Sequence, residues 1–95
     1  GILEMCILSV IDKSKEAYVS DLIETMKNAD MIVVEGTLYP LLTRLKNSGL
    51  LNYQWKESPT GPPRKYYVLT DSGKLFLSET LKAWSELQTM INKII

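Results

Sequence analysis

The side chains that can bind an anion are concentrated in the middle of this 95-residue chain. Residues 35–70 contain five Lys and Arg residues and two Glu residues, a net charge of +3 in a chain whose total formal charge is zero. Residues 1–34 carry a net charge of −3, and residues 71–95 are balanced. A cationic segment inside a neutral chain favours a local surface that faces phosphate groups, although charge that is merely solvated gives the same asymmetry.

Hydroxyl and cationic side chains on a predicted third helix are candidates for contacts with nucleic acid. Thr37 and Tyr39 stand at the opening of this helix, where side chains and backbone N–H groups can meet phosphate oxygens or base edges. Arg44, about two turns after Thr37, can donate to a phosphate or to a guanine. In the alternative interpretation Tyr39 packs on the preceding helix, Thr37 caps its own turn and Arg44 is an exposed cation. The candidate set on this helix is Thr37, Tyr39, Pro40, Thr43 and Arg44.

A second group of candidate phosphate-binding cations follows a segment rich in Pro and Gly, residues 58–63. Arg64 and Lys65 begin a segment with the alternating pattern of a strand. Because adjacent strand residues point to opposite faces, at least one of the two cations must point outward and can reach a phosphate. The alternative is a solvated pair. The neighbouring Tyr66 and Tyr67 are interpreted as structural residues that fill the space between hairpin and third helix.

The residues needed for catalysis or metal binding are missing. The chain contains no His, one Cys and no glycine-rich loop for a phosphate, and its Asp and Glu residues are scattered. Cys6 stands among Met5, Ile7 and Leu8, which is typical of a small buried hydrophobic side chain, and a single cysteine cannot form an internal disulfide. We therefore expect no catalytic residues, no metal site and no cofactor.

Three helices are predicted in the first half of the chain. Apolar residues recur at helical spacing over about residues 2–12 and again from residue 19 to about residue 30. A third helix carries the leucines of residues 38–45 and ends at Gly49, which can supply the left-handed residue that closes a helix. Pro40 would lose a backbone hydrogen bond, so we expect a loosened or kinked opening turn.

A hairpin is predicted next, because the period of the apolar residues changes from 3.6 to two after Gly49. Residues 51–56 form one predicted strand and residues 64–69 the other, with the Pro/Gly-rich segment as a tip that cannot continue either strand. Trp55 is interpreted as the core anchor of this hairpin. Thr70 and Asp71 then cap a long last helix.

The last helix carries more apolar surface than one small domain can cover, and its length of about 37 Å exceeds what such a domain needs. We expect a homodimer through this helix and the first helix, with an intramolecular fourth core helix as the alternative. Trp84 can stack on a small aromatic or hydrophobic effector, or can simply pack at the interface. The interface candidates are Leu3, Ile7, Leu77, Leu81, Trp84, Leu87, Met90, Ile91 and Ile94.

The order of three helices, a hairpin and a long helix defines the expected fold class. It is α+β, mostly α: a winged helix-turn-helix of residues 1–70, with three helices and a two-stranded wing, and a C-terminal dimerisation helix of residues 71–95 in one compact unit. In such a fold the third helix enters the major groove and the wing lies on the flanking backbone or minor groove. Winged helices also serve as protein-docking modules, so the fold alone does not decide the function.

Three motifs resemble those of the PadR family of bacterial transcriptional regulators: EGTLYPLLTRL at residues 35–45, SGLL at residues 48–51, and GPPRKYYVLT at residues 61–70, followed by Gly73. The resemblance implies a DNA-binding repressor that binds a near-palindromic promoter operator as a homodimer, mainly through the last helix, and is released by a small molecule or another signal. Tyr18 falls where the family carries a tyrosine at the start of the second helix, and it joins the DNA-binding candidates.

The compartment is expected to be the cytoplasm. No run of apolar residues approaches the roughly 18 of a membrane-spanning helix, and the apolar start lacks the basic region and cleavage site of a signal peptide. We therefore expect no membrane contact. Because the chain begins inside an apolar helix, we also expect a few residues upstream of Gly1.

Overall fold

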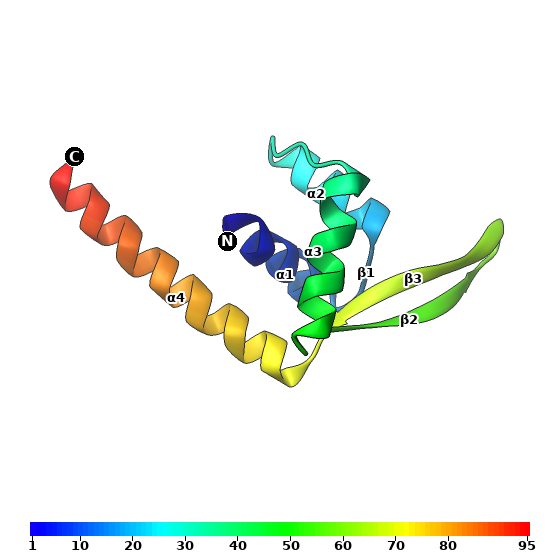
Figure 1. The fold of residues 1–95 in the computed structure, drawn as a ribbon. Coiled ribbons are helices and arrows are strands. Elements are labelled where there is room, and N and C mark those ends of the chain that lie inside the picture. The colour runs from blue at the N-terminus through cyan, green and yellow to red at the C-terminus, as the bar shows by residue number, and fades with distance from the viewer.

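The computed structural model describes residues 1–95 as four helices and a small antiparallel sheet. Figure 1 shows α1, α2 and α3 as a bundle from which the β2–β3 hairpin and α4 extend in opposite directions. This arrangement confirms the predicted fold class, and we call the β2–β3 hairpin the wing. The elements are α1 (Ile2–Ser14), β1 (Ala17–Tyr18), α2 (Val19–Asn28), α3 (Glu35–Asn47), β2 (Leu51–Ser58), β3 (Gly61–Leu69) and α4 (Asp71–Ile94).

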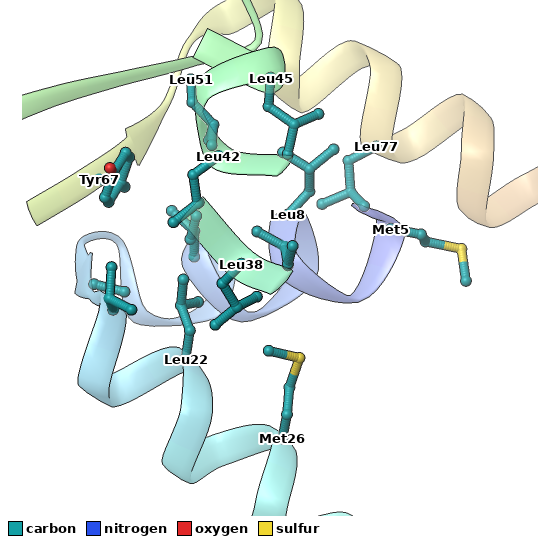
Figure 2. Close-up of a cluster of buried hydrophobic side chains, with 14 residues drawn as sticks. Met5, Leu8, Leu22, Met26, Leu38, Leu42, Leu45, Leu51, Tyr67 and Leu77 are labelled. Carbon is teal, nitrogen blue, oxygen red and sulfur yellow. The ribbon is translucent and has the colours of Figure 1, made fainter. Parts of the chain in front are cut away.

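The core lies between the facing sides of α1, α2 and α3, and the base of the wing and the start of α4 close it (Figure 2). Seven of its side chains are fully buried, and no polar side chain is buried with them. Burying one such Leu or Ile side chain stabilises the fold by about 1.5–3 kcal/mol. Because Leu38, Leu42 and Leu45 point inward, α3 must present its other side to solvent. The fully buried residues are Ile7, Leu8, Ile11, Leu22, Leu38, Leu42 and Leu51.

Both ends of α3 are defined by backbone hydrogen bonds. At its start the backbone N–H groups of Thr37 and Leu38 donate to the Val34 carbonyl over 3.0 and 3.1 Å. The helix continues across Pro40, and the expected loosening or kink of the opening turn stays a prediction. At its end Gly49 adopts a φ of 80°, and the N–H of Leu50 bonds back into the last turn, as the sequence predicts.

The sheet has the strand order β1–β3–β2, and its first strand was not predicted. β1 has only two residues, too few for an alternating pattern to show, and it pairs Tyr18 with Tyr66. The wing strands also run further than expected, since Pro62 and Pro63 belong to β3 and not to the tip. Proline has no backbone N–H to donate, and neither Pro62 nor Pro63 has a partner in the sheet, because the pairing of β2 with β3 is irregular between Lys56 and Ser58 and β1 does not reach that far.

Two predictions of burial are corrected by the structure. Trp55 is 63% exposed and does not anchor the wing. Figure 1 shows β2 and β3 extending away from the bundle. Tyr67 takes that role at 4% exposure, with its ring centroid 5.9 Å from that of Tyr53. Cys6 packs against the core but is only half-buried.

The first turn of α4 is fastened to the turn between α3 and β2. The Thr70 hydroxyl accepts from the Gly73 N–H over 2.9 Å and donates to the Gly49 carbonyl over 2.6 Å. The Thr70 N–H donates to the Leu50 carbonyl over 3.1 Å. Gly73 itself is pressed against this turn, since a Cβ added there would lie 2.1 Å from the Leu50 carbonyl oxygen.

Replacing Gly73 with Ala is therefore expected to lower the free energy of unfolding by about 2 kcal/mol or more, because only backbone can move to relieve the contact. Urea unfolding at one fixed protein concentration measures this loss. Gly36→Ala is the matched control, because a Cβ at Gly36 meets nothing within 4 Å and Ala in an exposed helix gains up to about 1 kcal/mol. Equal unfolding midpoints for the two variants would contradict this close packing.

Candidate nucleic-acid interface

A recess of about 400 Å³ lies where the N-terminal ends of α2 and α3 meet the wing. We call it the wing recess. It brings together four DNA-binding candidates from three separate parts of the sequence, namely Tyr18, Tyr39, Arg64 and Lys65. Its complete lining is Tyr18, Val19, Ser20, Glu35, Tyr39, Trp55, Pro63, Arg64 and Lys65.

Arg64 is held in place on one face of the wing. Its guanidinium carbon lies 4.1 Å from the ring centroid of Tyr18, and its Nη2 donates to the hydroxyl of Ser20 at the start of α2. The Tyr18 ring in turn meets the edge of Tyr66, with the ring centroids 6.3 Å apart. These contacts restrict the rotamers of Arg64, so that its remaining N–H groups are directed before any ligand binds.

Lys65 lies on the opposite face of the wing, as the alternation of strand residues predicts. Its Nζ is 4.4 Å from the ring centroid of Tyr53 and 5.4 Å from that of Trp55. Neither Arg64 nor Lys65 takes part in any of the three salt bridges of the structure. The positive charge of both side chains therefore remains unneutralised beside the recess.

A third cation of the wing has a different role. The Nζ of Lys56 donates to Glu16 over 2.8 Å and lies 5.0 Å from the Tyr66 ring centroid. The hydrogen bond to the Glu16 carboxylate, and then its negative charge, raise the pKa of Lys56 above its ordinary value. This ion pair joins the wing to the connection between α1 and β1. The charge of Lys56 is therefore already paired with a carboxylate of the protein itself.

The exposed residues of α3 do not all point the same way. Thr37, Pro40 and Thr43 are exposed, and Tyr39 lines the wing recess. Arg44 follows Tyr39 by five residues, which is about 140° around the helix, and its Nη2 lies 2.7 Å from the Glu4 Oε1 of α1. The structure therefore does not bring Arg44 together with Tyr39 and the wing cations.

Sequence reasoning missed Glu4 and Ser20 as partners of the candidate cations Arg44 and Arg64, and Glu16 as the partner of Lys56. It also missed Glu35 as a residue of the recess. Both salt-bridge partners lie 40 residues from their cations in sequence. Ser20 lies 44 residues from Arg64. No periodic pattern reports such distant pairs, whereas Glu35 could have been noticed as the acidic first residue of the predicted third helix.

Tyr67 of β3 is buried and carries a hydroxyl that can titrate. Burial raises the pKa of its hydroxyl above the ordinary value of about 10, and negative charge on Tyr39 and Tyr53 raises it further. Unfolded protein therefore loses this proton at a lower pH than folded protein does.

Stability is accordingly expected to fall as the pH rises above about 10, because the unfolded state then binds fewer protons than the native state. Tyr67→Phe removes the group and should make the fall shallower. Urea unfolding near neutral pH and above about pH 10 compares wild type with Tyr67→Phe and with Tyr66→Phe, a control on the opposite face of β3. An identical alkaline loss in all three proteins would exclude Tyr67 as its source.

The face between α1 and α4 is the second candidate site. A groove of about 360 Å³ runs between the two helices, and Ile2, Phe76, Trp84 and Leu87 are among the residues that line it. Trp84 is half-buried and packs against the core. Apolar side chains that remain exposed along α4 are Leu75, Phe76, Leu81, Leu87, Met90, Ile91 and Ile94.

Three of the predicted dimer-interface residues are buried or half-buried within the protomer. Ile7 is completely buried and Leu77 is 4% exposed, so both contribute to the core of one protomer and offer almost no surface to a second. Leu3 is half-buried against the same core. Phe76 and Leu75, which the sequence did not single out, are more exposed than either buried candidate.

The structure contains no group of three or more His, Cys, Asp and Glu side chains arranged to hold a metal ion. None of its helices combines the length and the apolar character that crossing a bilayer requires.

Comparison with known proteins relates the sequence and the fold of this chain to a family. Residues 7–79 match the model of the transcriptional regulator PadR-like family. The X-ray structure of a PadR-like transcription factor from Bacteroides fragilis is 56% identical and covers 100% of this chain and 91% of its own, with a TM-score of 0.89. A PadR-like regulator from Bacillus cereus is 38% identical over 99% of this chain and 91% of its own, with a TM-score of 0.86.

A curated relative is an uncharacterised protein of Lysinibacillus sphaericus. It is 33% identical over 94 residues, which are 97% of this chain and 86% of that protein. All residues that line the wing recess fall within the family match.

Proposed function

Because this chain belongs to the PadR-like family of transcriptional regulators, a family of transcription factors and not of enzymes, we propose that it represses transcription by binding a near-palindromic promoter operator as a homodimer. The observation that carries the proposal is the wing recess, where Tyr18, Tyr39, Arg64 and Lys65 converge from three parts of the sequence. Repression is the role that the PadR-like motifs imply.

The exposed side of α3 is the proposed reading surface. Thr37, Pro40 and Thr43 lie on this side, and the N-terminal residues of a recognition helix are those that meet base edges in the major groove. Arg64 and Lys65 then contact the flanking backbone, where unneutralised cations displace counterions from phosphates. Arg44 can contact DNA only if its salt bridge to Glu4 breaks.

The proposed dimer forms through α4 and the adjoining part of α1. Supporting it are the exposed apolar residues of α4, from Leu75 to Ile94, since large apolar patches on a small protein mark association surfaces. In this proposal residues 1–70 bind DNA and residues 71–95 dimerise. A twofold dimer would place its two α3 helices about 34 Å, or 10 base pairs, apart, or a multiple of that spacing.

The groove between α1 and α4 is the proposed effector site. Trp84 and Phe76 give it flat apolar surfaces that suit a small aromatic or hydrophobic molecule. Such a molecule would change the packing of α4 on α1, and with it the spacing of the two α3 helices.

A protein-docking module without DNA binding is the alternative, and the salt dependence of binding separates the two. Contacts with phosphates release counterions, so the logarithm of the DNA-binding constant should fall linearly with the logarithm of salt concentration, by about 0.9 per contact. A titration of labelled promoter DNA at several salt concentrations measures the slope. A slope near zero, or no binding at all, would favour the docking module.

A further inference from the structure

Glu35 is an acidic side chain in a place that a DNA-binding protein would be expected to keep free of negative charge. It is the first residue of α3 and is exposed to solvent. Its side chain lines the wing recess together with Tyr39, Arg64 and Lys65. It also borders a neighbouring recess between α2 and α3, lined on its other side by Ser20 and Lys27.

The Glu35 carboxylate has no partner inside the protein. It takes part in none of the three salt bridges, although two cations line the same recess. It accepts none of the side-chain hydrogen bonds of the structure either. The dipole of α3 stabilises a negative charge at the start of the helix. It does not explain why that charge lies beside Arg64 and Lys65 without pairing with either.

The chemistry of the major groove limits what this carboxylate can bind. Phosphate oxygens repel it, and the N7 and O6 atoms of purines and the O4 of thymine are acceptors like itself. The only donors on the base edges are the N4 amine of cytosine and the N6 amine of adenine. An ionised Glu characteristically accepts from cytosine N4, whereas bidentate recognition of adenine needs the amide of Asn or Gln.

We propose that Glu35 is a specificity-determining residue, which accepts a hydrogen bond from the N4 amine of a cytosine at one position in each half-site. The proposal rests on the proposed function. With any other base at this position, the Glu35 carboxylate either faces a hydrogen-bond acceptor or lacks the cytosine amine as a donor. Glu35 therefore weakens binding to operators without this cytosine as well as strengthening binding to operators that have it.

Selection of binding sites from a randomised duplex library tests the proposal with wild type, Glu35→Gln, Glu35→Ala and Glu57→Gln. Glu57 is an exposed acid of the wing, and its variant removes the same charge near DNA. Wild type and Glu57→Gln should select cytosine at one position of each half-site, with discrimination of about tenfold or more. Glu35→Ala should lose this preference, and Glu35→Gln should change it to adenine. Thermal unfolding of each variant checks that α3 is intact.

Two results would overturn the inference, and they are distinguishable. If both Glu35 variants keep the cytosine preference and bind all duplexes more tightly, as Glu57→Gln does, Glu35 only repels DNA and selects nothing. If wild type itself enriches no sequence, the proposed function fails and this inference fails with it.

Discussion

Replacing Ile91 with Glu is expected to convert the protein into a monomer at micromolar concentration and to weaken operator binding by about 100-fold or more. Ile91 lies on the exposed apolar side of α4. A carboxylate there would have to be buried without a partner if two copies of α4 packed together, which is strongly unfavourable. A monomer would then have to bind each half-site separately and lose the gain of bivalent binding.

Sedimentation equilibrium and operator titration measure the two effects. Lys82→Glu is the matched control, because residue 82 is nine residues from residue 91 and therefore lies on the opposite side of α4. The control should remain dimeric. A monomeric wild type, or an Ile91→Glu variant that still forms dimers, would show that α4 is not the interface.

Replacing Lys65 with Ala is expected to weaken binding to all DNA sequences alike, by roughly tenfold at 50 mM salt, and to flatten the salt slope by about one unit. The reason is that the Lys65 ammonium is free of carboxylate partners in the structure and lies at the edge of the wing recess. A phosphate contact carries no sequence information, so base preference should be unchanged.

Lys56→Ala is the control for Lys65→Ala, since it removes a wing cation that is already paired with Glu16. We expect it to leave the salt slope nearly unchanged, because Glu16 already neutralises this charge in the free protein. If Lys56→Ala flattened the slope as much as Lys65→Ala, the ion pair would have to open on DNA and the distinction between the two cations would be wrong.

The helices could be predicted from the sequence because their signals are local. Apolar residues at helical spacing mark α1 and α2, and Gly49 marks the end of α3 within a few residues of the turn it closes. The Thr70 cap of α4 is equally local, since its hydroxyl bonds the N–H three residues later. Each of these features depends only on residues that are close together in the sequence, so the sequence alone is sufficient to predict it.

The contacts that assemble the candidate site are not local, and the sequence did not reveal them. Arg44 looks like a DNA contact in sequence, but Glu4 lies 40 residues away and holds it in the structure. Alternation places Trp55 on the same face as Leu51, yet it cannot tell how far the wing extends beyond the core that buries Leu51. The two residues of β1 are likewise strand only because β3 lies beside them.

Binding of duplex DNA with a defined stoichiometry tests whether this protein is a dimer that recognises an operator sequence. The measurement is a fluorescence anisotropy titration of wild type, near physiological salt, on the inverted repeat recovered by selection and on a shuffled duplex of the same composition. We expect two protomers per duplex and an affinity for the repeat at least about 1,000-fold above that for the shuffled sequence. Equal affinity for the two duplexes, or saturation by a single protomer, would contradict it.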